Sequence, residues 1–206
     1  MIAVVDYGMG NLRSVAKALQ HVGGDVHIVQ TASELAGAEK VVLPGVGAFG
    51  EAMARLRSQR LVDPLARAAS NGSPFLGICL GLQLLFDVSY EGAEHTGLGV
   101  LAGKVVRFVF DPKVIGQDLS VPHMGWNTVH WSRPCPLLHG LDSGCHAYFA
   151  HSYYVVPLDA EVTCTATEYG YWFTSSIWRD NVFAMQFHPE KSQAVGLRML
   201  ENFVRL

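Results

Sequence analysis

The amino-acid sequence predicts an α/β fold with a mostly parallel central sheet flanked by helices. In residues 1–90, short continuous apolar runs alternate with segments of helical periodicity, a pattern typical of parallel strands covered on both faces. The remainder is rich in β-branched and aromatic runs, which predicts an antiparallel, strand-rich extension of the same core. No linker-like segment separates the two halves, so we expect residues 1–206 to form a single domain.

Composition and charge exclude several classes of protein. The formal net charge is −3 and the 15 Lys and Arg residues are scattered, so we expect no nucleic-acid partner. The chain begins without a basic signal region, and no apolar run approaches a membrane span, so we expect a cytoplasmic protein with no membrane partner. The 4 cysteines form no CxxC pair, which is typical of free thiols in a reducing compartment.

Two patterns that suggest a bound cofactor are incomplete. The histidines between positions 123 and 151 form no HxxxH pair and have no neighbouring cysteine pair, so roles on the surface or in the core are favoured over metal binding. Gly8 and Gly10 suggest a dinucleotide-binding fingerprint, but Arg13 stands where the third glycine would be. We therefore expect no metal and no other cofactor.

In the first half, apolar runs mark strands, and capping residues mark the starts of helices. Asn11 is expected to cap the first helix, and Asp63 followed by a proline to start another. Glycines or polar residues end the helices. The expected strands are 2–5, 26–29, 40–43 and 74–79, and the expected helices are 12–22, 48–56, 64–71 and 80–86.

In the second half, most segments are expected to be strands. Residues 87–99 are polar and contain glycine, so we expect a loop over the end of the sheet. Ser192 is expected to cap a closing helix that runs to residue 206 with one apolar stripe. The expected strands are 104–110, 126–131, 147–156, 161–167, 174–178 and 182–187.

Cys79 is the first candidate for chemistry, because it lies between two glycines where an apolar run changes to helical spacing. A nucleophile on such a turn stands at the carboxyl edge of a sheet. The following backbone N–H and the helix N-terminus can stabilise a thiolate and receive an oxyanion. By itself the segment is equally consistent with a small buried cysteine.

The glycine-rich segment 44–50 follows the third expected strand. Its glycines let backbone N–H groups point outward, which suits an oxyanion site at a strand end. Taken alone, it is equally consistent with a plain turn.

His188 and Glu190 follow the last expected strand. In extended chain, residues two apart share a face, so the carboxylate can orient and charge-stabilise the imidazole. Cys79 also follows a strand, and strand ends in an open sheet converge on one crevice. The three residues therefore form a candidate set of nucleophile, base and orienting acid.

Two motifs resemble those of the class I glutamine amidotransferases, a family with a flavodoxin-like α/β fold. Residues 77–83 match its GxCxGxQ elbow, and residues 188–190 match its His-Pro-Glu element. Residues 44–47 look like its oxyanion strand, and residues 89–92 resemble the segment that holds the substrate. The resemblance implies hydrolysis of L-glutamine to glutamate and ammonia through a cysteine thioester.

The resemblance also implies roles for individual residues. Cys79 would be the nucleophile, His188 the general base and then the acid, and Glu190 the group that fixes the histidine tautomer. The residues implied to form the oxyanion hole are Leu80, Gly45, Val46 and Gly47. Those implied to bind glutamine are Gln83, Glu91, Gly45, His151, Ser152 and Tyr153, with Glu91 facing the α-ammonium group.

Further motifs look like one branch of this family, whose members supply ammonia to a separate (β/α)8 cyclase subunit in histidine biosynthesis. They lie at 7–12, 122–127, 148–153 and 186–192, whereas nothing in 111–121 is recognised. The resemblance implies a heterodimer whose cyclase makes imidazole glycerol phosphate and an aminoimidazole carboxamide ribotide from a phosphoribulosyl formimino precursor. The residues implied at the interface or ammonia gate are Asn11, His123, Met124, Trp126 and Tyr148.

Three alternatives are weighed against this interpretation. Glutaminase subunits for anthranilate, purine or pyridoxal synthesis share the Cys, His and Glu motifs but not the motifs of this branch. An α/β-hydrolase with a cysteine nucleophile places its acid before the histidine in chain order, whereas Glu190 follows His188. A non-enzymatic regulatory module would require a broken triad, and all three members are present.

Overall fold

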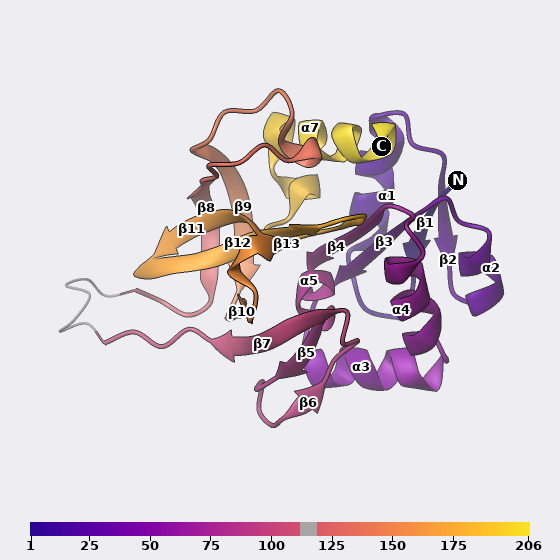
Figure 1. Cartoon of the computed structure of the whole chain (residues 1–206), viewed down its shortest axis with the longest axis horizontal. Coiled ribbons are helices and arrows are strands. Elements are labelled where there is room, and N and C mark those ends of the chain that lie inside the picture. The colour runs from indigo at the N-terminus through magenta and orange to yellow at the C-terminus, as the bar shows by residue number, and fades with distance from the viewer. Residues whose placement is uncertain (112–118) are drawn as a thin grey trace.

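The computed structural model describes residues 1–111 and 119–206, and its elements alternate between strand and helix in the first half (Figure 1). The helices are α1 (Leu12–His21), α2 (Ala32–Ala36), α3 (Phe49–Ser58), α4 (Val62–Ser70), α5 (Leu80–Leu84) and α7 (Gln193–Arg205), with 3-10 turns η1 (Pro136–Leu138), η2 (Ala160–Val162) and η3 (Pro189–Lys191). The early strands are β1 (Ile2–Val5), β2 (Val26–Val29), β3 (Lys40–Gly45), β4 (Phe75–Cys79), β5 (Phe86–Ser89), β6 (His95–Thr96) and β7 (Leu101–Arg107). The later strands are β8 (His123–Val129), β9 (Cys145–His151), β10 (Tyr153–Pro157), β11 (Thr163–Tyr169), β12 (Tyr171–Arg179) and β13 (Val182–Met185).

The main sheet has the strand order β2-β1-β3-β4-β13-β12-β10-β7-β5-β6, with β11 paired to β12. Its first five strands run parallel, whereas β13, β12, β10 and β7 pair with one another in antiparallel fashion. This mixed sheet matches the predicted parallel core with an antiparallel extension. Strands β8 and β9 form a separate two-stranded sheet.

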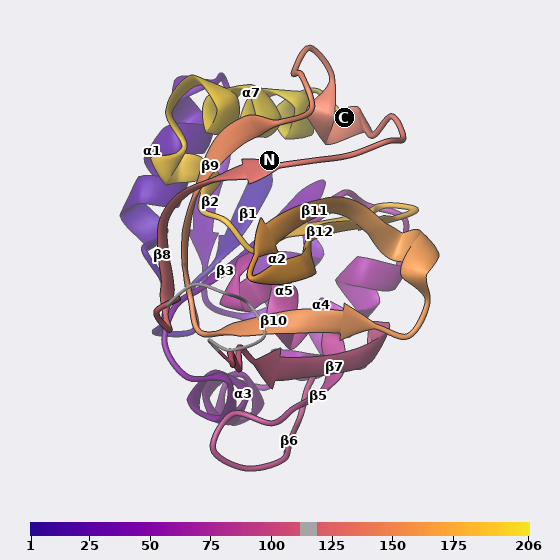
Figure 2. The same ribbon diagram turned by 90° about the vertical axis from the view of Figure 1, so that its left-hand side faces the viewer.

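Two apolar cores cover the two faces of the main sheet. Helices α1 and α7 pack on one face, and α2, α3, α4 and α5 on the other, as the two perpendicular views in Figures 1 and 2 show. Strands β1, β4 and β13 are buried along their whole length because both of their faces are covered. None of the helices in the described ranges is long and apolar enough to cross a membrane.

Three adjacent parallel strands, β3, β4 and β13, end at the same edge of the sheet. The register pairs Gly45 at the end of β3 with Cys79 at the end of β4. On the other side of β4, Met185 at the end of β13 pairs with Ile78. The segments that follow these strands therefore emerge side by side, which is the arrangement expected for a site at the carboxyl edge of an open sheet.

Glycines flank Cys79 because neighbouring backbone lies too close for a side chain. A Cβ atom on Gly81 would lie 1.8 Å from the Leu43 carbonyl oxygen. A Cβ atom on Gly77 would lie 2.8 Å from the Gly81 carbonyl oxygen and 2.9 Å from the Ala184 Cβ. The two glycines thus permit the strand-to-helix turn to pack directly against β3 and β13.

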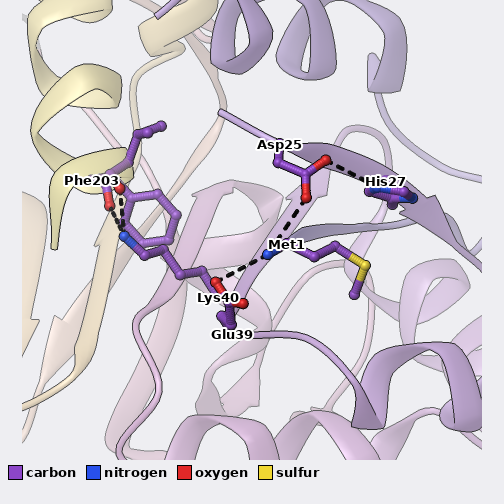
Figure 3. A network of polar contacts seen from close by, with 7 residues as sticks. Met1, Asp25, His27, Glu39, Lys40 and Phe203 are labelled. Atoms are coloured by element: carbon purple, nitrogen blue, oxygen red, sulfur yellow. Dashed lines mark hydrogen bonds and ion pairs between the residues drawn. The ribbon is translucent and has the colours of Figure 1, made fainter. Parts of the chain in front are cut away.

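A polar cluster ties the opposite, N-terminal end of the sheet to the last helix (Figure 3). The Met1 amino group lies 3.0 Å from the Glu39 carboxylate, next to β3. Lys40 donates hydrogen bonds from Nζ to the carbonyl oxygens of Phe203 (3.1 Å) and Val204 (2.5 Å) near the end of α7. A cation at this position satisfies carbonyls that lack intrahelical donors and interacts favourably with the helix dipole.

Several boundaries differ from the sequence prediction. The expected loop 87–99 contains the short strands β5 and β6, and the expected strand 147–156 breaks at Ser152 into β9 and β10, which belong to different sheets. Alternation of apolar and polar residues cannot reveal such a change of sheet. The unrecognised stretch 111–121 lies largely outside the described residues.

Two of the three predicted N-cap positions are confirmed, and the third is wrong. Asn11 and Ser192 occupy N-cap positions, but neither side chain makes a capping hydrogen bond. Helix α4 begins at Val62 with Leu61 as its N-cap, so Asp63 lies within the first turn. The Ser192 hydroxyl donates instead to the carbonyl oxygen of His188 at 2.7 Å, because the chain folds back between them.

The crowding at Gly81 predicts a large effect of one added methyl group. We expect Gly81→Ala to lower the free energy of unfolding by about 3 kcal/mol or more, because the Leu43 carbonyl must be displaced. The matched control is Gly37→Ala, since Gly37 has an ordinary φ of −89° and its nearest neighbour would lie 4.0 Å away. Equal urea-unfolding curves for the two variants would contradict this account of the elbow.

Candidate active site

Cys79 adopts a backbone conformation that side chains rarely occupy. Its φ is 54° and its ψ is −109°, at the junction where β4 ends and α5 begins. Such a conformation typically costs about 1–3 kcal/mol and persists only where the surroundings enforce it. Here the pairing of β4 with β3 and β13 enforces it, and the Leu80 N–H beside Cys79 belongs to a first helical turn that lacks intrahelical acceptors.

His188 and Glu190 form a buried pair in the segment after β13. The His188 Nδ1 lies 2.8 Å from Glu190 Oε1. Ser192 holds this turn in place, because its hydroxyl donates to the His188 carbonyl (2.7 Å) and accepts the Tyr148 N–H (3.0 Å). The second Glu190 oxygen has no hydrogen-bond partner among the described residues, so the carboxylate interacts mainly with the imidazole.

The charge on His188 follows from its two partners. Burial alone would lower the pKa of His188, but hydrogen bonds with Cys79 and Glu190 raise it to about 10. The imidazole therefore carries its proton at neutral pH, between the sulfur and the carboxylate. A thiolate beside an imidazolium is the arrangement in which cysteine acts as a nucleophile.

A cavity of about 340 Å³ opens over Cys79 and His188. Among the described residues, Glu91 is the only carboxylate in its lining. A second hollow of about 320 Å³ between α2 and α4 has no cysteine, histidine or carboxylate among the described residues that line it. The cavity over Cys79 is lined by Val46, Gly47, Cys79, Leu80, Gln83, Glu91, Pro122, Met124, Ala150, His151, Ser152, Tyr153, His188 and Lys191.

The predicted oxyanion segment lies beside the nucleophile and is tied to Glu91. Gly45 is buried opposite Cys79, and a Cβ on it would lie 2.4 Å from the Tyr7 hydroxyl, whereas Val46 and Gly47 face the cavity. Glu91 Oε2 accepts the Phe49 N–H at 2.7 Å, just after this segment. The carboxylate predicted to bind an ammonium group thus also anchors the predicted oxyanion segment.

Gln83 is less available to a substrate than the sequence suggests. Its Nε2 donates to the Tyr153 carbonyl oxygen (3.1 Å) and to Gln186 Oε1 (3.0 Å). Both amide hydrogens are therefore engaged within the protein. Only the side-chain oxygen of Gln83 is left for a ligand donor.

His123 and His151 form a hydrogen-bonded chain behind the cavity, with defined tautomers. His151 Nδ1 lies 2.8 Å from the Tyr153 carbonyl, which can only accept, so Nδ1 carries the proton. His151 Nε2 must then accept from His123 Nδ1 at 3.0 Å, and His123 Nε2 accepts from Asn127 Nδ2 at 3.2 Å. Burial lowers the pKa of His151 to about 3 and that of His123 to about 4, so both are neutral.

The residues predicted for a partner interface separate into two groups. Met124 (64% exposed) and Trp126 (47% exposed) present apolar surface on β8, and Met124 also lines the cavity. Tyr148 lies between the Trp126 ring and Lys191 Nζ, and Asn11 is exposed at the start of α1. His123 is buried, so the structure places it in the hydrogen-bonded chain rather than on a contact surface.

Sequence reasoning missed three residues near the nucleophile. Gln186 donates from Nε2 to Cys79 Sγ at 3.6 Å, and it shares a strand face with His188, which was an available signal. Lys191 lines the cavity and belongs to the motif 186–192, which implied no role for it. Tyr7 begins the motif 7–12 and has a buried hydroxyl without a hydrogen-bond partner among the described residues, a feature that the motif does not predict.

Comparison with known proteins agrees with this geometry. The family Glutamine amidotransferase class-I matches residues 3–206. The chain belongs to the class I glutamine amidotransferases. The predicted family is thereby confirmed, and this amidotransferase carries Cys79 at the junction of β4 and α5, in the lining of the cavity.

Two relatives are similar to this amidotransferase along nearly its whole length. The chain is 54% identical over 203 residues to the imidazole glycerol phosphate synthase subunit HisH of Syntrophotalea carbinolica, covering 98% of both chains. It is 52% identical over 203 residues to subunit HisH of Aquifex aeolicus, covering 98% of this chain and 95% of that one. These relatives confirm the predicted resemblance to HisH subunits of imidazole glycerol phosphate synthase.

Solved structures show the same fold at low sequence identity. PurLQS from Thermotoga maritima has a TM-score of 0.76 at 20% identity, covering 99% of this chain and 97% of that one. A crystal structure of a glutamine amidotransferase has a TM-score of 0.75 at 21% identity, covering 100% of both chains. The predicted α/β class with a largely parallel sheet is confirmed.

In the described ranges, no group of three or more His, Cys, Asp or Glu side chains is placed to hold a metal ion.

The neutral histidine chain predicts a loss of stability in acid. Because the pKa values of His123 and His151 lie below the usual 6.5, the unfolded state binds protons that the folded state does not. Stability should therefore fall as the pH decreases from about 6.5 toward 4. We expect His123→Gln, which can keep one donor and one acceptor, to reduce this fall in urea-unfolding midpoints between pH 7 and pH 5.

The matched control is His146→Gln, because His146 is exposed on the same hairpin. It should leave the dependence on pH as in the unmodified chain. Identical acid sensitivity of the His123 and His146 variants would contradict the assignment.

Proposed function

We propose that the chain hydrolyses the side-chain amide of L-glutamine and, as the glutaminase subunit of an imidazole glycerol phosphate synthase, supplies ammonia for histidine biosynthesis. The observation that carries the proposal is that Cys79 and protonated His188 line one cavity, while Glu190 is buried against His188. The similarity to HisH subunits over nearly the whole chain supports the choice of pathway. We also propose that residues 1–206 form one amidotransferase domain, since the family match spans 3–206.

In the first half-reaction, the Cys79 thiolate attacks the amide carbon of glutamine. The resulting oxyanion accepts hydrogen bonds from the Leu80 N–H and from a backbone N–H in 45–47, both beside the sulfur. His188 then donates its proton to the leaving nitrogen, and the carbon–nitrogen bond breaks to release ammonia. A glutamyl thioester on Cys79 is left, with a neutral imidazole.

In the second half-reaction, water hydrolyses the thioester. Neutral His188 removes a proton from the attacking water, while Glu190 at 2.8 Å keeps the ring oriented and stabilises the charge that develops on it. Collapse of the tetrahedral intermediate expels the Cys79 thiolate and releases glutamate. The thiolate and imidazolium are restored, so the cycle balances without a cofactor.

The cavity suits an amino acid with a polar head. Glu91 is the carboxylate among the described residues of the lining, and in the proposed binding mode it faces the α-ammonium group through the oxygen not used by Phe49. His151, Ser152 and Tyr153 line another wall, and Gln83 contributes its side-chain oxygen. In this binding mode the δ-amide lies over Cys79.

Free ammonia is useful only where a second site consumes it. We propose that a (β/α)8 cyclase covers the exposed apolar residues Met124 and Trp126, next to the cavity, and forms a heterodimer. That partner would convert a phosphoribulosyl formimino precursor to imidazole glycerol phosphate and an aminoimidazole carboxamide ribotide. An α/β-hydrolase reaction is disfavoured, because the acid that contacts His188 follows it in the chain.

Replacement of Cys79 should separate the hydrolysis of glutamine from the ammonia-dependent synthesis by the cyclase. We expect Cys79→Ser to abolish glutamate release from glutamine, because a serine hydroxyl is not ionised beside His188. Synthesis by the cyclase complex with added ammonium salt should continue at the rate of the unmodified complex. Loss of both activities in a correctly assembled complex would contradict the proposed division of labour.

The conformation of the predicted oxyanion segment, residues 45–47, also predicts that the rate of glutamine hydrolysis depends on the partner. Gly47 has φ +94°, so the peptides around it can rotate at low cost, and an N–H can point away until the partner binds its own substrate. We expect the isolated chain to release glutamate about a hundredfold more slowly than the complex with that substrate, the loss typical of one missing oxyanion donor. Equal rates would rule out this coupling.

A further inference from the structure

Gln186 lies beside the nucleophile, yet the mechanism above does not use it. The residue is fully buried, and its Nε2 lies 3.6 Å from Cys79 Sγ. Strands β13 and β4 pair in parallel up to Met185 and Ile78, so the next residues along the two strands, Gln186 and Cys79, are neighbours. The approach of this amide to the sulfur is therefore determined by the register of the sheet.

The orientation of the Gln186 amide is determined by its other contact. The Tyr153 carbonyl only accepts hydrogen bonds, so the end of Gln83 that lies 3.1 Å from it is the Nε2 donor. The same Nε2 lies 3.0 Å from Gln186 and donates its second hydrogen to Oε1. Gln186 consequently presents its oxygen to Gln83 and its N–H to the sulfur.

The Tyr153 carbonyl, which orients the Gln83 amide, is itself held in place. His151 Nδ1 donates to the same Tyr153 carbonyl at 2.8 Å, and His151 is fixed in turn by His123. The backbone N–H of Gln186 donates to the Ser175 carbonyl at 2.8 Å, which holds the main chain of Gln186 against β12. The amide that faces Cys79 is thus constrained at both its side chain and its backbone.

We propose that Gln186 is a further catalytic residue, whose side-chain N–H donates a hydrogen bond to the Cys79 thiolate. This inference rests on the proposed function, in which the sulfur is charged before attack and again when it leaves the thioester. A hydrogen bond to a charged acceptor is stronger than one to a neutral group, so the bond favours the thiolate over both thiol and thioester. Gln186 raises the population of nucleophile and assists departure of the sulfur in the second half-reaction.

Two substitutions separate this role from simple support of Gln83. Gln186→Met removes both the donor to the sulfur and the acceptor for Gln83. Gln186→Glu keeps an oxygen for Gln83 but replaces the donor with a carboxylate oxygen. Both variants are made in the full chain, with folding checked by circular dichroism and thermal unfolding, and either folded variant decides the question.

The first measurement is the rate of Cys79 alkylation by iodoacetamide as a function of pH, with Cys79→Ala as background for the other cysteines. We expect the profile to shift to higher pH by about one to two units in both variants, as for loss of a hydrogen bond to an ion. The shift should be larger for Gln186→Glu, because its charge repels the thiolate. The kcat for glutamine in the cyclase complex should fall about tenfold or more in both.

Two results would overturn the inference. One is an alkylation profile that coincides with that of the unmodified chain in a folded variant. The other is recovery of the unmodified kcat by Gln186→Glu together with a raised KM in Gln186→Met, which would show that the residue only supports Gln83. Ser175→Ala is the matched control, since the buried Ser175 side chain bonds Thr165, and the substitution keeps the backbone carbonyl that accepts the Gln186 N–H.

The same experiment distinguishes this inference from the proposed function. If the unmodified complex releases no glutamate from glutamine, the proposed function fails. If the unmodified complex is active and the Gln186 variants match it in both measurements, only the role of Gln186 fails.

Discussion

The parallel pairing of β3, β4 and β13 is the constraint on which the site depends. It places the ends of three segments that are distant in sequence side by side, with Gly45 opposite Cys79 and Gln186 next to it. Under the proposed function, each strand end contributes one part of the site: the predicted oxyanion segment, the predicted nucleophile, and His188 with Glu190. A slip of one residue in either register would turn these groups to the opposite face of the sheet.

The same pairing supports the strained conformation of Cys79. A residue at φ 54° and ψ −109° is costly in isolation, and here it is held between strands that leave no space for a side chain on Gly77 or Gly81. This conformation holds Cys79 at the start of α5, where the buried residue lines the cavity next to the first-turn N–H groups. Stability of the elbow and reactivity of the thiol therefore have a common physical origin.

The buried histidines of the site differ in whether they carry a proton. His188 is buried between two acidic partners and keeps its proton, whereas His151 and His123 are buried among acceptors, donors and aromatic rings and lose theirs. The charged imidazole can donate a proton to a leaving group. In the neutral pair, each imidazole donates one hydrogen bond and accepts one. His151 donates to the Tyr153 carbonyl, which also accepts a hydrogen bond from Gln83.

Local periodicity and short motifs in the sequence were enough to predict the α/β class, most strands and helices, and the candidate residues Cys79, His188 and Glu190. The folded structure was needed to show that 147–156 splits between two sheets, that His123 is buried, and that the Ser192 side chain bonds the His188 carbonyl instead of making a capping hydrogen bond. It also brought Gln186 to the sulfur and engaged both amide hydrogens of Gln83. These outcomes depend on strand register and on contacts between distant segments, which no local pattern encodes.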